Sequence, residues 1–187
     1  HRIDISTAQT SHSAFTIQLD AFQNYSDNNY KVKVRPTTSG VLGPAIVTKR
    51  FNDTYQNGTK ITYVGLVNKS YAAKLLLGLT IGRNYKEIQS GARMETAVFG
   101  AYHRRGNILM PSFKYKKTDI IKGLDLTLNA NYNLGYEQNI DTVNLRYNWL
   151  RETTPTTSGE RNGRTLAKYR NNNGLATAML SYKINEN

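Results

Sequence analysis

A strict alternation of apolar and polar residues over positions 124–137 limits what this chain can fold into. The even-numbered positions hold Leu, Leu, Leu, Ala, Tyr, Leu and Tyr, and the odd-numbered positions hold Asp, Thr, Asn, Asn, Asn, Gly and Glu. Because successive side chains of a β-strand point to opposite faces of its sheet, this pattern predicts a strand with one apolar and one polar face. Strands in globular proteins are usually about 5–6 residues long, so a strand of 14 residues is unusually long.

Shorter runs with the same period of two recur along the chain, and no segment of ten residues has the period of an amphipathic helix. The sequence therefore predicts an all-β fold built from antiparallel strands. Eight strands are expected, over residues 3–5, 15–21, 31–35, 61–67, 73–82, 108–116, 124–137 and 175–184.

The connections between these expected strands alternate in length. Residues 25–29, 67–70 and 117–123 are short and rich in turn formers, whereas residues 36–59, 84–106 and 138–173 are long. Outer-membrane barrels have this arrangement, because tight turns lie at one rim and long loops at the other. Residues 84–106 are expected to be mainly loop, although Met94, Thr96, Val98 and Gly100 alternate and could form another strand.

The composition is compatible with two classes of β protein. The net charge is +12, the mean hydropathy is −0.57 and there is no cysteine. The longest apolar stretch, around residues 75–79, is far shorter than the ~20 residues of a membrane-spanning helix. A spanning β-strand needs only ~9–11 residues with one apolar face, and Tyr132 and Tyr136 at the end of such a face fit an aromatic girdle.

The alternative is a soluble extracellular β-sandwich that binds carbohydrate, because its strands also alternate. The two classes make opposite predictions for the leucine side chains, which face lipid in a barrel and a second apolar sheet in a sandwich. The residues that distinguish them are Leu75, Leu77, Leu79, Leu124, Leu126 and Leu128.

Several short motifs follow one another in a familiar order. They are FNDTY at 51–55, QSGARM at 89–94, VFG at 98–100, KGLDL at 122–126, NYN at 131–133, DT at 141–142, RYNW at 146–149 and YRNNNGLA at 169–176. Together they resemble the barrel region of Bacteroidetes-type TonB-dependent outer-membrane receptors. The chain departs from that pattern before Glu152, where the family has glycine and this sequence has Arg151.

The resemblance implies a transmembrane β-barrel of about 22 strands, closed by a plug and coupled through a TonB box. Neither plug nor box is recognisable, so we expect residues 1–187 to be part of the barrel domain, about eight strands of a longer chain. The implied location is the bacterial outer membrane. The implied partners are outer-membrane lipid, the receptor's own plug, TonB acting through the plug, and a small nutrient ligand such as an iron chelate, oligosaccharide or peptide.

Two loops hold candidate ligand-binding residues. Aromatic and arginine side chains combine contact area with directed hydrogen bonds, and they gather in the loop at 138–173. The candidates there are Arg146, Tyr147, Trp149, Arg151 and Glu152, with Arg161 and Arg164; in the loop at 84–106 they are Gln89 and Arg93, beside Met94 and Glu95. For each loop the alternative is that these side chains only pack the loop. Four polar residues are expected to face the lumen and contact the plug: Asp125, Asn129, Asn131 and Asn133.

Other functions find little support in the sequence. His1, His12 and His103 lack the spacing of a metal site, and there is neither a nucleophile elbow nor a phosphate loop. We therefore expect no enzyme activity, no catalytic residues, no metal and no cofactor. Basic clusters at 103–105, 114–117 and 161–170 could bind nucleic acid. They lie at expected strand ends and loops, where Lys and Arg can pair with lipid phosphates, so we expect no nucleic-acid partner.

Overall fold

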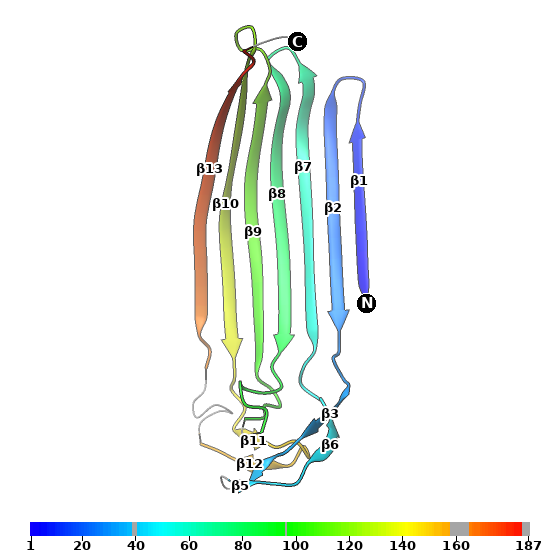
Figure 1. Ribbon diagram of the computed structural model, residues 1–187, viewed down its shortest axis with the longest axis vertical. Helices are drawn as coiled ribbons and strands as arrows, with labels where there is room; N and C mark the ends of the chain where they lie inside the picture. The colour runs from blue at the N-terminus through cyan, green and yellow to red at the C-terminus, as the bar shows by residue number, and fades with distance from the viewer. Residues whose placement is uncertain (39–40, 96, 158–164, 185–187) are drawn as a thin grey trace.

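The computed structural model describes residues 1–38, 41–95, 97–157 and 165–184. Seven long strands form one antiparallel sheet in the order β1-β2-β7-β8-β9-β10-β13, with β1 and β13 as its two edges, so the sheet is open (Figure 1). The prediction of an all-β fold with antiparallel strands is confirmed. The long strands are β1 (Arg2–Thr10), β2 (Phe15–Ser26), β7 (Tyr55–Lys69), β8 (Ala72–Glu87), β9 (His103–Lys117), β10 (Leu124–Ile140) and β13 (Lys168–Tyr182).

Tight turns join the strands at one end of the sheet. They connect β1 to β2, β7 to β8 and β9 to β10, and the last two are the short connections predicted near residues 70 and 120. Gly123 ends the third turn with a φ of 81°, a left-handed conformation that glycine adopts without steric cost. The backbone N–H of Gly123 donates a hydrogen bond to Asp119 Oδ1 at 3.0 Å.

Long loops gather at the opposite end of the sheet (Figure 1). We call the described residues of 27–54, 88–102 and 141–167 the loop cap. Short and long connections alternate along the main sheet, and residues 88–102 form a loop as expected. The short connection predicted at residues 25–29 is wrong, because the segment that begins there reaches the next strand of the main sheet only at Tyr55. The cap holds the short strands β3 (Lys31–Val34), β4 (Thr37–Thr38), β5 (Val41–Leu42), β6 (Ile46–Lys49), β11 (Leu145–Tyr147) and β12 (Thr153–Pro155).

Two sequence predictions about the strands are wrong in detail. The run at 31–35 is not a strand of the main sheet: β3 pairs only with β6, and its Val34 side chain is buried in the loop cap. The sheet therefore has seven strands. In addition, the long strands continue into segments expected to be loop, such as the Asn-rich residues 171–173, because the partner strand supplies their backbone hydrogen bonds.

One face of the sheet carries apolar side chains on each of its seven strands, and we call it the apolar face. Directly paired residues share a face, so the register aligns Val64, Leu77 and Phe113 across β7, β8 and β9. Leu77 is 60% exposed and Leu180 is 66% exposed. Each long strand contacts only its hydrogen-bonded neighbours. In the described part of the chain, then, no second sheet packs on this face as it would in a sandwich.

The opposite face carries the polar residues of β10 together with some apolar residues of other strands, such as Leu76 and Ile108, and we call it the polar face. Asn129, Asn131 and Asn133 lie on it together with Asp125, because all four are odd-numbered residues of β10. Thr80 of β8 also lies there and is only 8% exposed. The predicted separation of apolar and polar residues between two faces is present on β10. It is incomplete elsewhere, because Ile61, Tyr63 and Val67 of β7 lie on the polar face. Over the described ranges, no helix has the length and apolar character needed to cross a membrane.

Candidate functional site: the loop cap

An apolar cluster around Trp149 holds the three parts of the loop cap together. Trp149 is 1% exposed and packs with Val34 and Val98. Its indole Nε1 donates a hydrogen bond to the Met94 carbonyl at 2.6 Å, and its own carbonyl accepts one from Thr48 Oγ1 at 2.9 Å. These contacts come from all three loops, so burial of one side chain couples their positions.

A polar cluster around Gln89 fixes the base of the cap. Gln89 is 1% exposed, and its Oε1 accepts hydrogen bonds from the N–H groups of Phe51 at 2.6 Å and Asn52 at 2.8 Å. Its Nε2 donates to the Phe99 carbonyl at 3.1 Å. Asn52 Nδ2 donates to the carbonyls of Ile88, Phe99 and Tyr102 at 3.0–3.2 Å. The two amides thus satisfy buried backbone groups that no sheet partner reaches.

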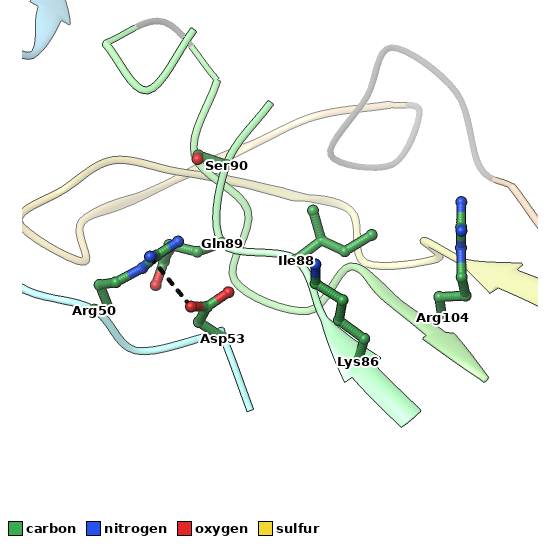
Figure 2. A pocket seen from close by; sticks show the side chains of 7 residues that line it. All are labelled: Arg50, Asp53, Lys86, Ile88, Gln89, Ser90 and Arg104. Atoms are coloured by element: carbon green, nitrogen blue, oxygen red, sulfur yellow. Dashed lines mark ion pairs between the residues drawn. The ribbon is translucent and has the colours of Figure 1, made fainter. Parts of the chain in front are cut away.

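A pocket of about 270 Å³ opens where the cap meets the ends of β8 and β9 (Figure 2). Arg50 Nη1 pairs with Asp53 Oδ2 at 3.3 Å, and both side chains are mostly buried. Arg50 also donates to the Tyr30 hydroxyl at 2.6 Å. The Nε of Arg50 is buried without a hydrogen-bond partner among the described atoms. The lining residues are Arg50, Asp53, Lys86, Ile88, Gln89, Ser90 and Arg104.

The electrostatics of this pocket favour an anion. Three of its side chains are cationic and one is acidic. Burial raises the pKa of Asp53, an effect that Glu87 reinforces and that Arg50 and Lys86 oppose. Arg104 pairs with Glu137 at 3.0 Å and stays half exposed. Because Lys86 pairs directly with Arg104 in the sheet register, both lie on the polar face. A carboxylate or phosphate group is the ligand chemistry that such cations recognise.

The predicted ligand residues differ in how far their side chains are buried. Trp149 and Gln89 lie inside the cap, where almost none of their side-chain surface is open to a ligand. Tyr147 is half buried and packs against Phe51, with ring centroids 6.3 Å apart. The predicted ligand residues with exposed side chains are Arg93, Arg146, Arg151 and Glu152. Ligand binding by these residues stays a prediction, and Arg161 and Arg164 lie outside the described residues.

Arg151 occupies a backbone conformation that favours glycine, the residue that the resemblance led us to expect there. Its φ is 66°, in the left-handed region where glycine is favoured. Asn148 Oδ1 accepts hydrogen bonds from the N–H groups of Leu150 and Glu152 at 2.9 and 3.0 Å, which fixes the turn. The Arg151 guanidinium lies over the Phe51 ring, 5.2 Å from its centroid. A cation–π contact therefore offsets part of the backbone strain.

Sequence reasoning did not identify the pocket residues Arg50, Asp53, Lys86 and Arg104 as a site. They come from three separate segments, which only the folded chain brings together. Two signals pointed towards them: Asp53 belongs to the FNDTY motif, and Arg104 belongs to the basic cluster at 103–105.

Comparisons of the chain with protein-family models, with curated proteins and with solved structures gave no match. Among the described residues, no group of three or more His, Cys, Asp or Glu side chains is placed to hold a metal ion.

Proposed function

We propose that this chain forms part of the wall of an outer-membrane β-barrel receptor that imports a nutrient by TonB-coupled transport. The observation that carries the proposal is the uncovered apolar face of the seven-stranded sheet. Soluble proteins rarely expose an apolar patch of more than a few hundred Å². A bilayer gives such a face an apolar environment, whereas water does not.

The height of the apolar band fits a membrane. On β10 the apolar residues run from Leu124 to Leu134, a separation of 134 − 124 = 10 residues. At ~3.4 Å per residue this is ~34 Å along the strand, and a strand tilt of ~40° reduces it to ~26 Å across the bilayer, against ~25 Å in outer-membrane barrels. Tyr182, which pairs with Leu124, and Tyr136 flank the band at its two ends.

Tyrosines also flank the band on other strands. On the apolar face, Tyr115 lies near the tight turns, where its hydroxyl donates a hydrogen bond to the Tyr71 carbonyl at 2.9 Å, and Tyr25 and Tyr85 lie near the loop cap. Aromatic rings at the two membrane interfaces are typical of such barrels. Tyr132 was expected in the same girdle, but it lies at the middle of β10, beside Gly174 of β13. Its ring belongs to the band and not to its border.

The band also crosses the strands obliquely. When the residue pairs are followed from strand to strand, Ile5 of β1 aligns with Asn172 of β13. In the same way, Gln9 of β1 aligns with Ala176 of β13. The apolar residues of β13 therefore lie nearer the tight turns than those of β1. Strands of a closed barrel tilt by about 35–45° to its axis, so a band parallel to the membrane has to shift from strand to strand.

The polar face then lines the lumen, and the loop cap captures the ligand at the outer rim. The cationic pocket at Arg50, Lys86 and Arg104 opens on the polar face, so an anionic group of an iron chelate or peptide fits there. In hydrocarbon, exposed backbone groups of an open sheet edge need partners. The proposal therefore requires further strands beside β1 and β13. The plug and TonB follow from the family resemblance.

A cysteine scan over residues 124–137, in a background without other cysteines, tests the membrane proposal, and residues 1–187 contain no native cysteine. Each single cysteine is spin-labelled in the complete protein in lipid bilayers, and its accessibility to oxygen and to a water-soluble nickel chelate is compared. We expect even-numbered positions to favour oxygen and odd-numbered positions to favour the chelate. Equal accessibility of both sets to the chelate would contradict the proposal.

Growth assays identify the nutrient class. Deletion of the gene should impair growth on one defined source of iron, glycan or peptide and leave growth on the others unchanged. Reintroduced protein carrying Arg50→Gln and Lys86→Gln should restore growth poorly if the nutrient is anionic. Full restoration of growth by this variant would show that the pocket does not take part in ligand capture.

A further inference from the structure

We infer that the exposed face of the hairpin formed by β3 and β6 binds an extended acidic peptide. Four exposed cations belong to this hairpin, and we call them the hairpin cations: Lys31 and Lys33 on β3, Arg35 directly after β3, and Lys49 on β6. The inference rests on the proposed function as a nutrient receptor and deepens it, because it names the class of nutrient. It also adds a second set of contacts to those of the pocket at Arg50.

The hairpin separates its cations from its apolar residues. β3 and β6 lie side by side in the loop cap (Figure 1). Val34 packs with Trp149 in the apolar cluster, and Ile46 pairs directly with Val34 and packs there too. Lys31 and Lys49 pair with each other three residues away and are both exposed. Because side chains of a strand alternate between its faces, the packed face holds the hairpin in place and the cationic face stays open.

The hairpin cations have no acidic partner among the described residues. None of the described ion pairs includes one of them. Of the two acids that flank the hairpin in the sequence, Asp53 pairs with Arg50, and Asp27 accepts a hydrogen bond from a backbone N–H of its own turn. Lys31 and Lys49 lie directly opposite each other, and like charges in this position destabilise a pair of strands. An anion from outside the chain relieves that repulsion.

The spacing of the hairpin cations fits an extended ligand. Lys31, Lys33 and Arg35 recur at every second residue, so they form a row about 13 Å long. Side chains on one face of an extended peptide repeat at the same spacing, which places alternate acidic residues opposite the cations. Val47 lies across from Lys33, is 67% exposed and suits the methylene groups of a glutamate side chain. A sugar acid carries its carboxylate directly on the ring and has no such stem.

One end of the row adjoins the pocket of Figure 2. Tyr30 precedes Lys31, and the Tyr30 hydroxyl accepts a hydrogen bond from Arg50 Nη1 at 2.6 Å. The Arg50 guanidinium also lies over the Tyr30 ring, 5.3 Å from its centroid. Arg50 lines the pocket together with Lys86 and Arg104. A peptide bound along the row therefore reaches the pocket with one end, and a carboxylate at that end meets these cations.

Peptide binding by the complete protein in detergent micelles tests this inference. The probe is a fluorescein-labelled peptide in which glutamate alternates with serine, and fluorescence anisotropy gives its Kd. Each exposed ion pair contributes up to about fivefold in affinity, so we expect the same peptide with glutamine in place of glutamate to bind at least ~10-fold more weakly. The difference should shrink at high salt, because exposed charges are screened. Equal binding of the two peptides would overturn the inference.

The variant Lys31→Gln with Lys33→Gln should bind the acidic peptide at least ~5-fold more weakly, because it removes two such ion pairs. The control is Lys74→Gln with Lys116→Gln, which removes two exposed cations that pair with each other on the main sheet near the tight turns; it should bind as tightly as the unchanged protein. Unchanged binding by the first variant, or an equal loss in the control, would overturn the hairpin site.

Two further measurements identify what kind of ligand occupies the hairpin. A peptide with its glutamates in one block and its serines in another should bind more weakly than the alternating peptide, and equal binding would contradict the extended pose. Displacement of the alternating peptide by an oligogalacturonate of equal charge at equal concentration would overturn the assignment to a peptide. These assays do not depend on the bilayer, whereas the cysteine scan uses no ligand, so failure of this inference and failure of the proposed function are distinguishable.

Discussion

The ring of Tyr63 on β7 lies over Gly78 on β8, in the space where a Cβ atom of residue 78 would be. The two residues pair directly on the polar face, and Lys114 Nζ lies 4.1 Å from the ring centroid. Tyr132 and Gly174 form a second cross-strand pair of this kind on β10 and β13. An aromatic ring over a paired glycine covers backbone that would otherwise lack side-chain packing in the strand interior.

Substitution of Gly78 by alanine should destabilise the sheet, because the new methyl group would overlap the Tyr63 ring and Ser112 Oγ. We expect the free energy of unfolding to fall by ~1–3 kcal/mol in reversible urea unfolding of the bilayer-reconstituted protein. In a Tyr63→Ala background the same change should cost at least ~0.5 kcal/mol less. Additive effects of the two substitutions would show that the ring does not pack on the glycine.

The strands and their faces were predictable because alternation is a local property of the sequence. Each of the seven long strands contains a run that the period of two identified. The run at 31–35 has the same local pattern, but which partner a short strand finds depends on distant residues such as those of β6. The position of Tyr132 in the sheet also needed the register, which pairs this residue with Gly174 at the middle of β10.

The candidate site was less predictable, because aromatic and amide side chains serve binding and packing equally well. Trp149 and Gln89 have the composition of a binding site, and the fold uses them to join loops. The pocket at Arg50 and Lys86 needs tertiary contacts that no local pattern contains. At Arg151 the resemblance led us to expect glycine, and the structure has a left-handed residue there, although ligand binding by Arg151 stays a prediction.

Arginine substitutions on β8 should show which positions lie deep in the membrane and which lie near its surface. Leu77 lies in the middle of the apolar run and Ala73 lies near the tight turn, on the same face. We expect Leu77→Arg to cost ~2–4 kcal/mol of unfolding free energy in bilayers and Ala73→Arg only ~0–1 kcal/mol. Equal small costs for both would be the result for a sheet that faces water, and they would contradict the proposed location.

Replacement of Gln89 by leucine should loosen the loop cap. The change leaves the N–H groups of Phe51 and Asn52 without their buried partner, at ~1–3 kcal/mol for each unpaired group, whereas the Phe99 carbonyl keeps its hydrogen bond from Asn52 Nδ2. Hydrogen exchange at Phe51 and Asn52 should then accelerate at least ~10-fold. The control is Ser90→Ala in the same pocket, and similar exchange in the two variants would exclude a structural role for the amide.

Arg151 allows backbone strain and side-chain contact to be separated. Arg151→Gly relieves the left-handed φ but loses the contact with Phe51, so the two effects of ~0.5–1 kcal/mol should nearly cancel. Arg151→Ala loses the contact and keeps the strain, so it should be less stable than Arg151→Gly by ~0.5–1 kcal/mol. Urea unfolding measures both, and a more stable alanine variant would contradict the strained conformation.

The stability of the loop cap should depend on pH through the carboxyl group of Asp53. Burial raises the pKa of this carboxyl above its ordinary value of 3.8. Since the pKa in the folded protein exceeds that in the unfolded chain, proton binding favours folding. This contribution is fully present below pH 3.8 and is lost as the pH rises through the raised pKa. The loop cap should therefore lose some stability over that interval, and Asp53→Asn should abolish this part of the pH dependence.

The carboxyl carbon shift of Asp53, followed by NMR from acidic to neutral pH, measures the pKa directly. Arg50→Gln should raise the pKa further, because it removes the cation that most favours the charged carboxylate, and Lys86→Gln should raise it less. Glu87→Gln should lower the pKa, because it removes a neighbouring negative charge. Lys33→Gln, an exposed cation of β3, is the control and should leave the pKa unchanged. A lower pKa in Arg50→Gln would contradict the ion pair between Arg50 and Asp53.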